Sequence, residues 1–327
     1  MPAIPASFCA SIVVSAALLS ACTAGSAQTW PAKPIHIVVP YIAGGGVDAF
    51  GRILAGKLQE RLGAPVVIDN RGGAGGNVGG NYVAKSPADG YTILLNTNGQ
   101  AVTPAIFKSL PYDSVTDLVR VVRLVSTSTA LVANRDLPIR GFRDFVDYVR
   151  AHPGQLNYGS SGVGNNLHLT MEMIKNRAGL DIQMVPFTGD APLYAALIGG
   201  QIQFALAPTT FGKPHIDSGE IRAIGVTTAM RVSTLPDVPT IAEQGMPDFN
   251  ITGWMGLFAP AGTPRDIVDR LARAAGSVID APDFRQVLTN LTIDPAVAGP
   301  DAFDKIYRDD VARFKQIVSD AHIPMQE

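Results

Sequence analysis

One unit recurs along most of this chain: a short apolar run, a loop rich in glycine and small polar residues, and a segment with apolar residues at helical spacing. It first occurs as the run 35–39 (Ile-His-Ile-Val-Val), the loop 41–47, and a segment in which Phe50, Leu54 and Leu58 lie four residues apart. Such a run predicts a buried strand, and such spacing predicts an amphipathic helix that begins near Asp48, a candidate N-cap. Alternating strands and helices favour an α/β fold with parallel sheets.

The unit occurs in both halves of the sequence, which predicts two lobes. A chain of 327 residues with 46% hydrophobic residues is long enough for two cores, at roughly 150 residues per domain. No linker rich in proline, serine or glycine separates the halves, so we expect the chain to cross between the lobes more than once, with the crossing strands as hinge. Further predicted elements are strands 66–68, 92–95, 156–158, 184–185 and 254–258, and helices 142–152, 167–178, 191–198 and 300–321.

The charge pattern gives no indication of a nucleic-acid partner. Lysine and arginine number 26 against 28 acidic residues, a net charge of −2, and no long block of one sign occurs. The five histidines are scattered, without a metal-binding spacing or a cysteine partner, so no metal or other cofactor is predicted.

The N-terminal segment has the features of an export signal. The apolar run 8–19 is too short to span a bilayer and is followed by small residues, although no basic residue precedes it. Two cleavage sites compete: one after Ala27, and one before Cys22, where Leu19-Ser20-Ala21-Cys22 resembles a lipobox whose cysteine becomes lipidated. We therefore expect residues 1–27 to be a signal peptide, with lipidation of Cys22 as the favoured alternative.

The loops that follow the predicted strands are suited to binding an anion. Ligands of open α/β sheets lie beyond the carboxyl ends of the strands, where the next helix presents free N–H groups and the positive end of its dipole. Glycine in a single loop is more often just a turn residue. Here, however, glycine-rich or small polar segments occupy four such positions: 44–46, 72–76, 160–162 and 188–189.

Motifs of the commonest α/β enzymes are incomplete. The G-x-G-x-x-G fingerprint fails because Val78 and Leu167 stand where its last glycine belongs. The serine-nucleophile elbow fails at 159–163, since Val163 replaces the final glycine. We predict a binding protein and not an enzyme, with an α/β hydrolase as the less favoured alternative. His168 either caps the helix that it begins or faces the cleft.

Eight segments in order resemble the Bug-type substrate-binding proteins of tripartite tricarboxylate transporters. They are VVPYIAGGGVD, NRGGAGGNVGG, DGYTILLN, KSLPYD, LNYGSSGVGNNLHL, PFTGDAPLYAALIGGQI, LPDVPTIAEQG and GLFAPAGTP, and the match extends from Trp30 to the C-terminus. The resemblance implies a type II periplasmic-binding-protein fold with a ligand cleft between two Rossmann-like lobes. Lobe 1 would comprise residues 30–129 and 253–327, and lobe 2 residues 130–252.

The resemblance also implies a function and a site. The chain would be a monomeric periplasmic receptor that binds a small carboxylate by cleft closure and delivers it to the permease subunits of the transporter; a sensor for a membrane signalling protein is the alternative. Main-chain amides and polar groups of both lobes would hold the carboxylate. The residues implied or singled out as ligand contacts are Tyr41, Gly46, Val47, Asp48, Thr97, Asn98, Ser160, Ser161, Asn165, Asn166, His168, Phe187, Thr188, Gly189 and Thr209.

Departures from the usual family pattern bear on the ligand. Val47 replaces a common threonine, Phe187 and Thr188 stand where a tyrosine and lysine are common, and Gln203 replaces an acidic residue. Thr209 ends a segment, 207–209, that stands where relatives often have Asp-Asn, a pair suited to an amino group. We therefore expect a carboxylate with an apolar or aromatic body and no amine, such as a benzoate-type or terephthalate-type acid.

Overall fold

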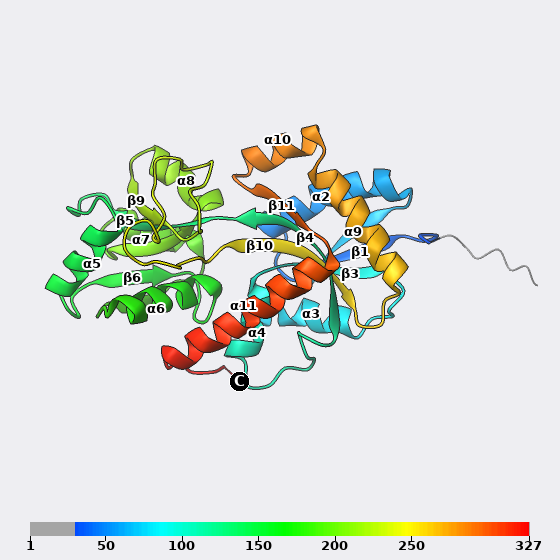
Figure 1. The fold of residues 1–327 in the computed structure, drawn as a ribbon, viewed down its shortest axis with the longest axis horizontal. Coiled ribbons are helices and arrows are strands. Elements are labelled where there is room, and N and C mark those ends of the chain that lie inside the picture. The colour runs from blue at the N-terminus through cyan, green and yellow to red at the C-terminus, as the bar shows by residue number, and fades with distance from the viewer. Residues whose placement is uncertain (1–29, 327) are drawn as a thin grey trace, which may run out of the picture. The chain divides into compact units, whose positions relative to one another are not determined.

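The structure is a computed structural model that describes residues 30–326, and the predicted signal segment and Cys22 lie outside the described residues. From Lys33 onward the chain forms one compact unit. This unit contains two β-sheets, each covered by helices, and we refer to the sheets with their helices as lobe 1 and lobe 2 (Figure 1). The α/β fold with two lobes predicted from the sequence is confirmed.

Lobe 1 contains a six-stranded sheet in the order β11-β4-β10-β3-β1-β2. Strand β1 is parallel to both β2 and β3, whereas β10 is antiparallel to its two neighbours, β3 and β4. Its strands are β1 (Ile35–Val39), β2 (Val66–Asn70), β3 (Thr92–Thr97), β4 (Leu118–Thr127), β10 (Gly253–Pro260) and β11 (Asp294–Ala298).

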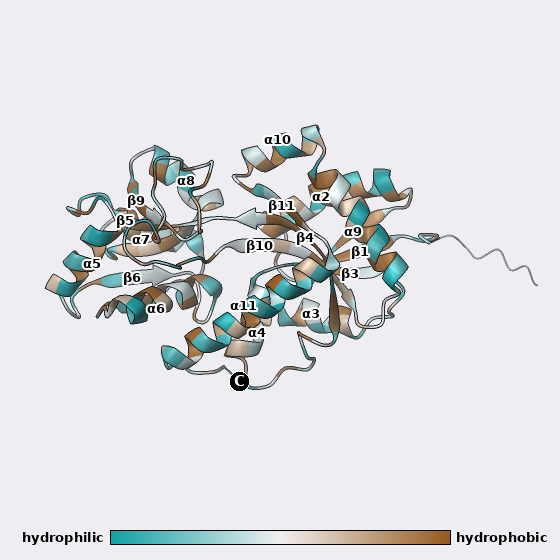
Figure 2. Ribbon diagram, in the orientation of Figure 1, coloured by the Kyte–Doolittle hydropathy of each residue, from teal (hydrophilic) through white to brown (hydrophobic). Residues whose placement is uncertain are grey.

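Helices cover both faces of this sheet. Helices α2 and α9 pack on one face, and α3, α4 and α11 pack on the other. The helices of lobe 1 are α2 (Gly46–Leu62), α3 (Asn77–Ala84), α4 (Gly99–Ile106), α9 (Arg265–Ile279), α10 (Pro282–Asn290) and α11 (Pro300–Asp320), with a short 3₁₀ turn at Ala74–Gly76. Figure 2 shows α9 and α11 alternating between hydrophilic and hydrophobic colours, as expected of helices with one buried face.

Lobe 2 contains a five-stranded sheet in the order β7-β6-β8-β5-β9, in which β6 is parallel to β7 and β8 while β5 is antiparallel to β8 and β9. Its strands are β5 (Thr129–Asn134), β6 (Asn157–Ser160), β7 (Gln183–Pro186), β8 (Phe204–Pro208) and β9 (Ile221–Val226). Its helices are α5 (Phe142–Ala151), α6 (Asn166–Ala178), α7 (Asp190–Ile198) and α8 (Thr209–Asp217).

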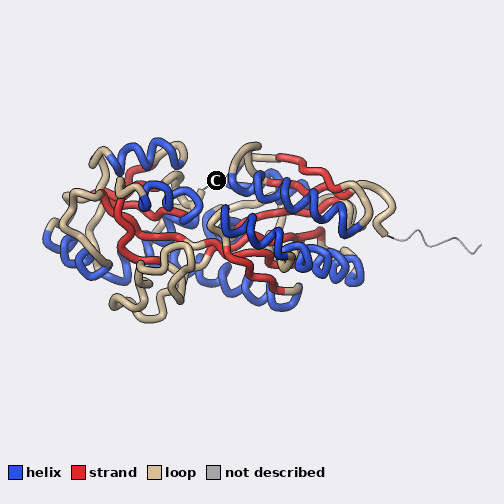
Figure 3. The backbone as a smooth tube through the Cα atoms, turned by 90° about the horizontal axis from the view of Figure 1, so that it is seen from above, coloured by secondary structure: helices blue, strands red, loops and turns tan. Residues whose placement is uncertain are grey.

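The chain crosses between the lobes twice. Strand β4 leads through Ser128 directly into β5, and residues 227–252 return the chain to β10 (Figure 3). The crossings lie side by side, since the Thr227 amide donates to the Thr129 carbonyl (2.9 Å) and Gly253 pairs with Thr127. Because β4 leaves lobe 1 and β10 re-enters it, they run in opposite directions. The sheets are therefore mixed and not wholly parallel, unlike the sheets that the alternation predicts.

Two local predictions need correction. Asp48 is not the N-cap of α2: the helix begins one turn earlier than expected, and its N-cap is Gly45. The predicted strand 254–258 continues to Pro260, because Ala259 and Pro260 pair with β4, a contact that local sequence does not indicate.

Candidate functional site

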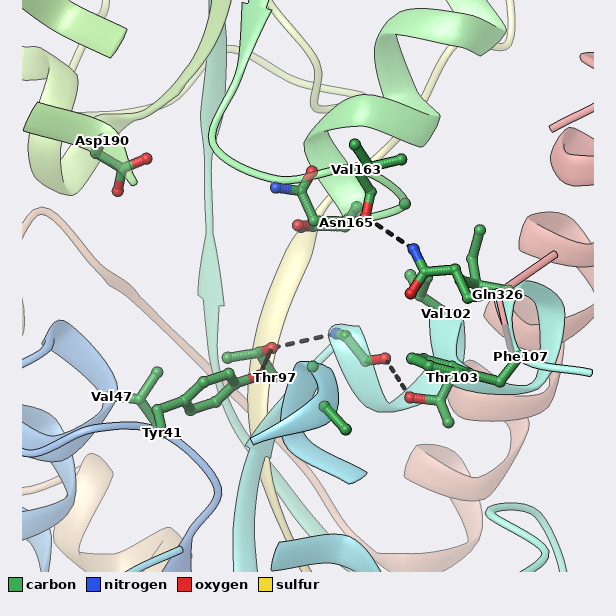
Figure 4. Close-up of a pocket in the computed structure, with 16 residues that line it drawn as sticks. Tyr41, Val47, Thr97, Val102, Thr103, Phe107, Val163, Asn165, Asp190 and Gln326 are labelled. Carbon is green, nitrogen blue, oxygen red and sulfur yellow. Dashed lines mark hydrogen bonds between the residues drawn. The ribbon is translucent and has the colours of Figure 1, made fainter. Parts of the chain in front are cut away.

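A cavity of about 530 Å³ lies between the two lobes, at the carboxyl ends of several strands. Its size is within the range of small-molecule sites. Figure 4 shows Tyr41, Val47 and Thr97 on the lobe 1 side, and Val163, Asn165 and Asp190 on the lobe 2 side. The lining residues are Tyr41, Val47, Ala74, Gly75, Thr97, Gly99, Val102, Thr103, Ile106, Phe107, Val163, Gly164, Asn165, Asn166, Asp190 and Gln326.

Hydrogen bonds fix the polar groups of lobe 1. The Tyr41 hydroxyl donates to Asn96 Oδ1 (2.9 Å) and lies 3.0 Å from Thr97 Oγ1. Because Tyr41 uses its proton on Asn96, the Thr97 hydroxyl donates to Tyr41, and it accepts from the Gly99 amide (3.1 Å). Burial raises the pKa of Tyr41 above its ordinary value, so the hydroxyl stays protonated and keeps its hydrogen bond to Asn96.

The loop between β1 and α2 is held by Asp48, which is buried and does not line the cavity. Its carboxylate accepts from the Gly44 amide (2.8 Å), from Arg52 Nε (3.0 Å) and from Asn70 Nδ2 (2.9 Å). These donors, with that of Arg52 first, lower the pKa of Asp48 to about 2. Asp48 therefore fixes the loop that presents Tyr41 and Val47.

The loop between β6 and α6 is held by neutral side chains. Asn165 is the N-cap of α6, and its side-chain oxygen accepts from the His168 amide (2.8 Å). The buried ring of His168 accepts at Nδ1 from the Gly164 amide (2.9 Å), and burial lowers its pKa. The Ser160 hydroxyl donates to the Gly162 carbonyl (2.9 Å). His168 therefore neither caps the helix nor lines the cavity, but supports the loop that does.

Four helices direct their N-terminal ends at the cavity, two from each lobe. Val47 lies at the start of α2 and Gly99 starts α4, while Asn166 starts α6 and Asp190 starts α7. The first N–H groups of a helix have no partner within it and carry partial positive charge. Among the described residues that line the cavity, none is lysine, arginine or histidine. The arrangement suits an anion bound by amides and hydroxyls.

Apolar side chains gather at one end of the cavity. Val102, Ile106 and Phe107 follow the start of α4 along the chain, and Val163 faces them from lobe 2. Figure 4 shows Val102 and Phe107 beside Gln326, on the side away from Tyr41 and Val47. The cavity can therefore accommodate a ligand with a polar end and an apolar body.

Five of the residues expected to contact the ligand line the cavity, and the others are not among its lining residues. Asn98 is buried and accepts at Oδ1 from Asn166 Nδ2 (3.3 Å), which joins the lobes, and Gly46 lies against the Phe211 ring of α8. Thr209 bonds to Ser128 at the hinge (2.8 Å), and Phe187 packs on the core of lobe 2. The lining residues are Tyr41, Val47, Thr97, Asn165 and Asn166; Ser161, Thr188 and Gly189 are not among them.

Sequence reasoning missed most of the apolar end and the one ionisable carboxylate of the lining. Asp190 closes the loop 186–190, and its position at a helix start was a signal that could have identified it. Val102, Ile106 and Phe107 show the spacing of an ordinary core helix, so nothing local distinguishes them. Gln326 lies more than 200 residues from the strand loops of lobe 1, and no local pattern indicates it.

Residues 30–326 show neither a metal centre nor a membrane-spanning helix. No group of three or more histidine, cysteine, aspartate or glutamate side chains in this range has a geometry that could hold a metal ion. None of the helices in the same range is both long enough and apolar enough to cross a bilayer.

Two α/β lobes joined by two crossing segments, with a small-molecule cavity between them, define the class of two-lobed solute-binding proteins. The chain belongs to the tripartite tricarboxylate transporter receptor family, whose model matches residues 50–323. This confirms the resemblance drawn from the eight sequence segments. Members of the family are periplasmic solute-binding receptors, and this chain is therefore a receptor of that kind.

Similar proteins cover most of the chain. The protein BugT of Bordetella pertussis (strain Tohama I) is 34% identical over 295 residues, which are 90% of each chain. The periplasmic binding protein BugD is 31% identical with a TM-score of 0.77, covering 91% of this chain and 100% of its own.

Two similar structures contain ligands. Rpa4515 of R. palustris with adipate is 33% identical with a TM-score of 0.80, covering 91% of this chain and 100% of its own. MatC of Rhodopseudomonas palustris with bound malate is 29% identical with a TM-score of 0.75, covering 88% of this chain and 100% of its own.

Proposed function

We propose that this receptor captures a small carboxylate in the interlobe cavity by closure of the lobes and delivers it to the permease subunits of a tripartite transporter. The observation that carries the proposal is the convergence of four helix N-termini, two from each lobe, on one cavity. An anion between them gains contacts with both lobes only when the lobes approach, so it shifts the population towards the closed state.

The energetics fit reversible capture. A hydrogen bond to a charged group contributes about 1.5 to 3 kcal/mol, and a few of them, less the cost of ordering and closure, give affinities near micromolar. We propose that the carboxylate lies at the polar end of the cavity, where the first amides of α6 donate to it. The Tyr41 and Thr97 hydroxyls and the Gly99 amide lie beside it, and each would donate to it only by giving up its hydrogen bond within lobe 1. Asp48, Ser160 and His168 then act by holding the loops, without touching the ligand.

We further propose that the ligand has an apolar or aromatic body. The side chains at the far end of the cavity are apolar, and Val47 replaces a common threonine at its near end. The adipate of Rpa4515 has four methylene groups between its carboxylates, which supports a ligand of this kind, whereas the malate of MatC is short and polar. Family membership therefore does not determine the body of the ligand, and the apolar lining of this chain's cavity favours an apolar one.

Asp190 restricts the number of carboxylates that the site tolerates. It contributes negative charge to the cavity at the start of α7, apart from Asn165 in Figure 4. A second carboxylate near it would be repelled, by about 1 kcal/mol at 4 Å in a water-filled site. We propose a monocarboxylate such as benzoate as the preferred form, with a dicarboxylate accepted where its second group avoids Asp190.

Isothermal titration with benzoate, terephthalate, adipate, malate, citrate and glutamate tests the ligand class. We expect the aromatic acids to bind at micromolar concentration and glutamate and citrate not to bind. Asp190→Asn should improve binding of terephthalate more than that of benzoate. Tight binding of glutamate or citrate without binding of any aromatic acid would contradict the proposed ligand, and no heat with any acid would contradict carboxylate capture.

A transport receptor and a sensor differ in the membrane protein to which they bind. A similar cleft would serve a sensor that passes its ligand state to a membrane signalling protein. Loss of uptake of the bound acid on deletion of the gene supports transport, whereas unchanged uptake with lost induction supports sensing. The hydrolase alternative gains no support, because the side chains of Ser160 and His168 form hydrogen bonds with the backbone of the loop.

We propose that residues 1–27 are removed on export or, if cleavage precedes Cys22, that this cysteine anchors the mature protein by a lipid. Intact-mass measurement of the protein from its host distinguishes the two forms. We propose lobe boundaries at residues 129–130 and 252–253. The first lies one residue into β5, next to the crossing at Ser128, and the second lies where residues 227–252 meet β10. Sedimentation analysis tests the expected monomer.

A further inference from the structure

The segment that follows α11 is docked on lobe 1 by its backbone. The Gln326 amide donates to the Ile106 carbonyl (2.7 Å), and the Lys108 amide donates to the Gln326 carbonyl (2.9 Å). Ile323, three residues earlier, is buried in the same core cluster as Ile106 and Val318. Gln326 is therefore held by lobe 1 on both sides of its backbone, immediately beside the end of α4.

The side chain of Gln326 extends across to lobe 2. Its Nε2 donates to the Val163 carbonyl at 3.1 Å, as Figure 4 shows. The next residue, Gly164, lies so close that a Cβ on it would be 2.8 Å from Gln326 Nε2 and 3.2 Å from Ile106 Cγ2. Gly164 also has φ +76°, a conformation that favours glycine. The loop between β6 and α6 thus packs against the C-terminal segment as closely as its backbone permits.

The same contact borders the cavity. Gln326, Val163 and Gly164 all line it, at the end where Val102 and Phe107 lie. Behind the contact, Leu169 of α6 is fully buried in the core cluster of lobe 1, and the Asn176 side chain donates to the Asp320 carbonyl (2.8 Å). One side of the cleft is therefore closed by α6, by α11 and by Gln326 in the segment after α11.

We propose that Gln326 is a positioning and specificity residue of the receptor: it fastens the β6–α6 loop of lobe 2 to lobe 1 and forms the neutral end wall of the ligand cavity. The role as end wall rests on the proposed function, whereas the fastening of the loop is independent of it. The loop that it fastens carries Asn165 and the start of α6, which face the carboxylate. Loosening the loop separates those amides from the groups of lobe 1.

Two variants at this position separate the hydrogen bond from the wall. Gln326→Met has a similar length and volume but no donor for the Val163 carbonyl. Gln326→Glu also lacks the donor and adds a negative charge at the cavity. Gln316→Met is the matched control, because Gln316 lies exposed on α11 and donates to Asp320 (2.6 Å), remote from the cavity lining.

The first measurement is hydrogen exchange of the full-length protein without ligand. Gln326→Met should raise the exchange rate of peptides covering residues 161–168 about fivefold, as expected for one lost hydrogen bond, and Gln316→Met should leave it unchanged. Unchanged exchange in Gln326→Met would overturn the fastening role. This result does not depend on which acid binds.

The second measurement is titration with terephthalate and adipate. Gln326→Met should weaken binding about fivefold, and Gln326→Glu should weaken it further because its charge faces an anion. Equal affinities of these two variants would overturn the wall. If no acid binds the unaltered protein, the proposed function fails, while the exchange experiment still decides whether Gln326 fastens the loop.

Discussion

In lobe 1 the loop before α2 is held by an ionised carboxylate, whereas in lobe 2 the loop before α6 is held by neutral side chains. Asp48 gathers three donors, one of them charged, around one side chain. In lobe 2 two side chains hold the loop, since Asn165 and His168 each accept a hydrogen bond from one backbone amide. Both loops present a helix N-terminus to the same cavity, so the two lobes fix similar geometry with different sensitivity to mutation and to pH.

The largest expected effect comes from removing the charged anchor. Asp48→Ala leaves the Gly44 amide without its acceptor and Asn70 Nδ2 with only the Tyr41 carbonyl (3.3 Å), and it should lower the free energy of unfolding by about 2 to 3 kcal/mol. Asp48→Asn keeps an acceptor but no charge for Arg52, so it should cost less. Urea unfolding followed by circular dichroism measures both. Equal stability of Asp48→Ala and the unaltered protein would show that the loop of lobe 1 is not held in this way.

Loss of the neutral anchor should cost less. Asn165→Ala removes the side-chain cap of α6 and should lower the free energy of unfolding by about 1 kcal/mol, together with weaker benzoate binding. Asn290→Ala, on the exposed end of α10, provides the control and should change stability little. If Asn165→Ala proves as damaging as Asp48→Ala, the contrast between the lobes is wrong.

The two anchors should titrate in separate pH ranges. Burial holds the pKa of His168 below its ordinary 6.5, opposed by Glu172 and reinforced by Lys175. The unfolded chain therefore takes up this proton first, and the stabilisation is complete above pH 6.5 and lost as the pH falls towards the lower native pKa. Asp48 stays ionised through this range, since its stabilisation is lost only between pH 3.8 and about 2.

Affinity measured between pH 7 and 5 checks this difference. Protonation of His168 would place a proton on Nδ1 against the Gly164 amide, so benzoate affinity should fall about threefold, in line with a modest hydrogen bond. His168→Asn keeps an acceptor for Gly164 without titrating and should bind independently of pH. A fall that persists in this variant would assign the pH effect to another group.

The smallest effects distinguish residues within the lobe 2 loop. Asn166 lines the cavity and joins Asn98 of lobe 1, so Asn166→Ala should weaken benzoate binding about threefold without unfolding the protein. Ser161 is absent from the described lining, so Ser161→Ala should have less effect than a sequence argument alone suggests. Titration of both variants with benzoate measures this difference. A larger loss of affinity in Ser161→Ala than in Asn166→Ala would place the ligand elsewhere on the loop.

Much of the architecture could be predicted from local pattern. Strand 35–39 and the helices that follow residues 141 and 165 occur within a residue or two of their predicted limits, because apolar spacing and capping act over a few residues. The family resemblance pointed to Tyr41, Thr97, Asn165 and Asn166, and all four line the cavity, since they lie near strand ends or helix starts and in α/β folds those positions meet at one edge of the sheet.

The tertiary structure alone decided which side chains face the cavity. Asp48 points away from the cavity because Arg52 and Asn70, one on its own helix and one on β2, supply its donors. Gln326 faces the cavity because the chain returns to pair with residues 106–108 after more than 200 residues. The sequence by itself determined the family, the two lobes and the loops that border the cavity. The direction of each side chain depended on partners far along the chain, to which local periodicity is insensitive.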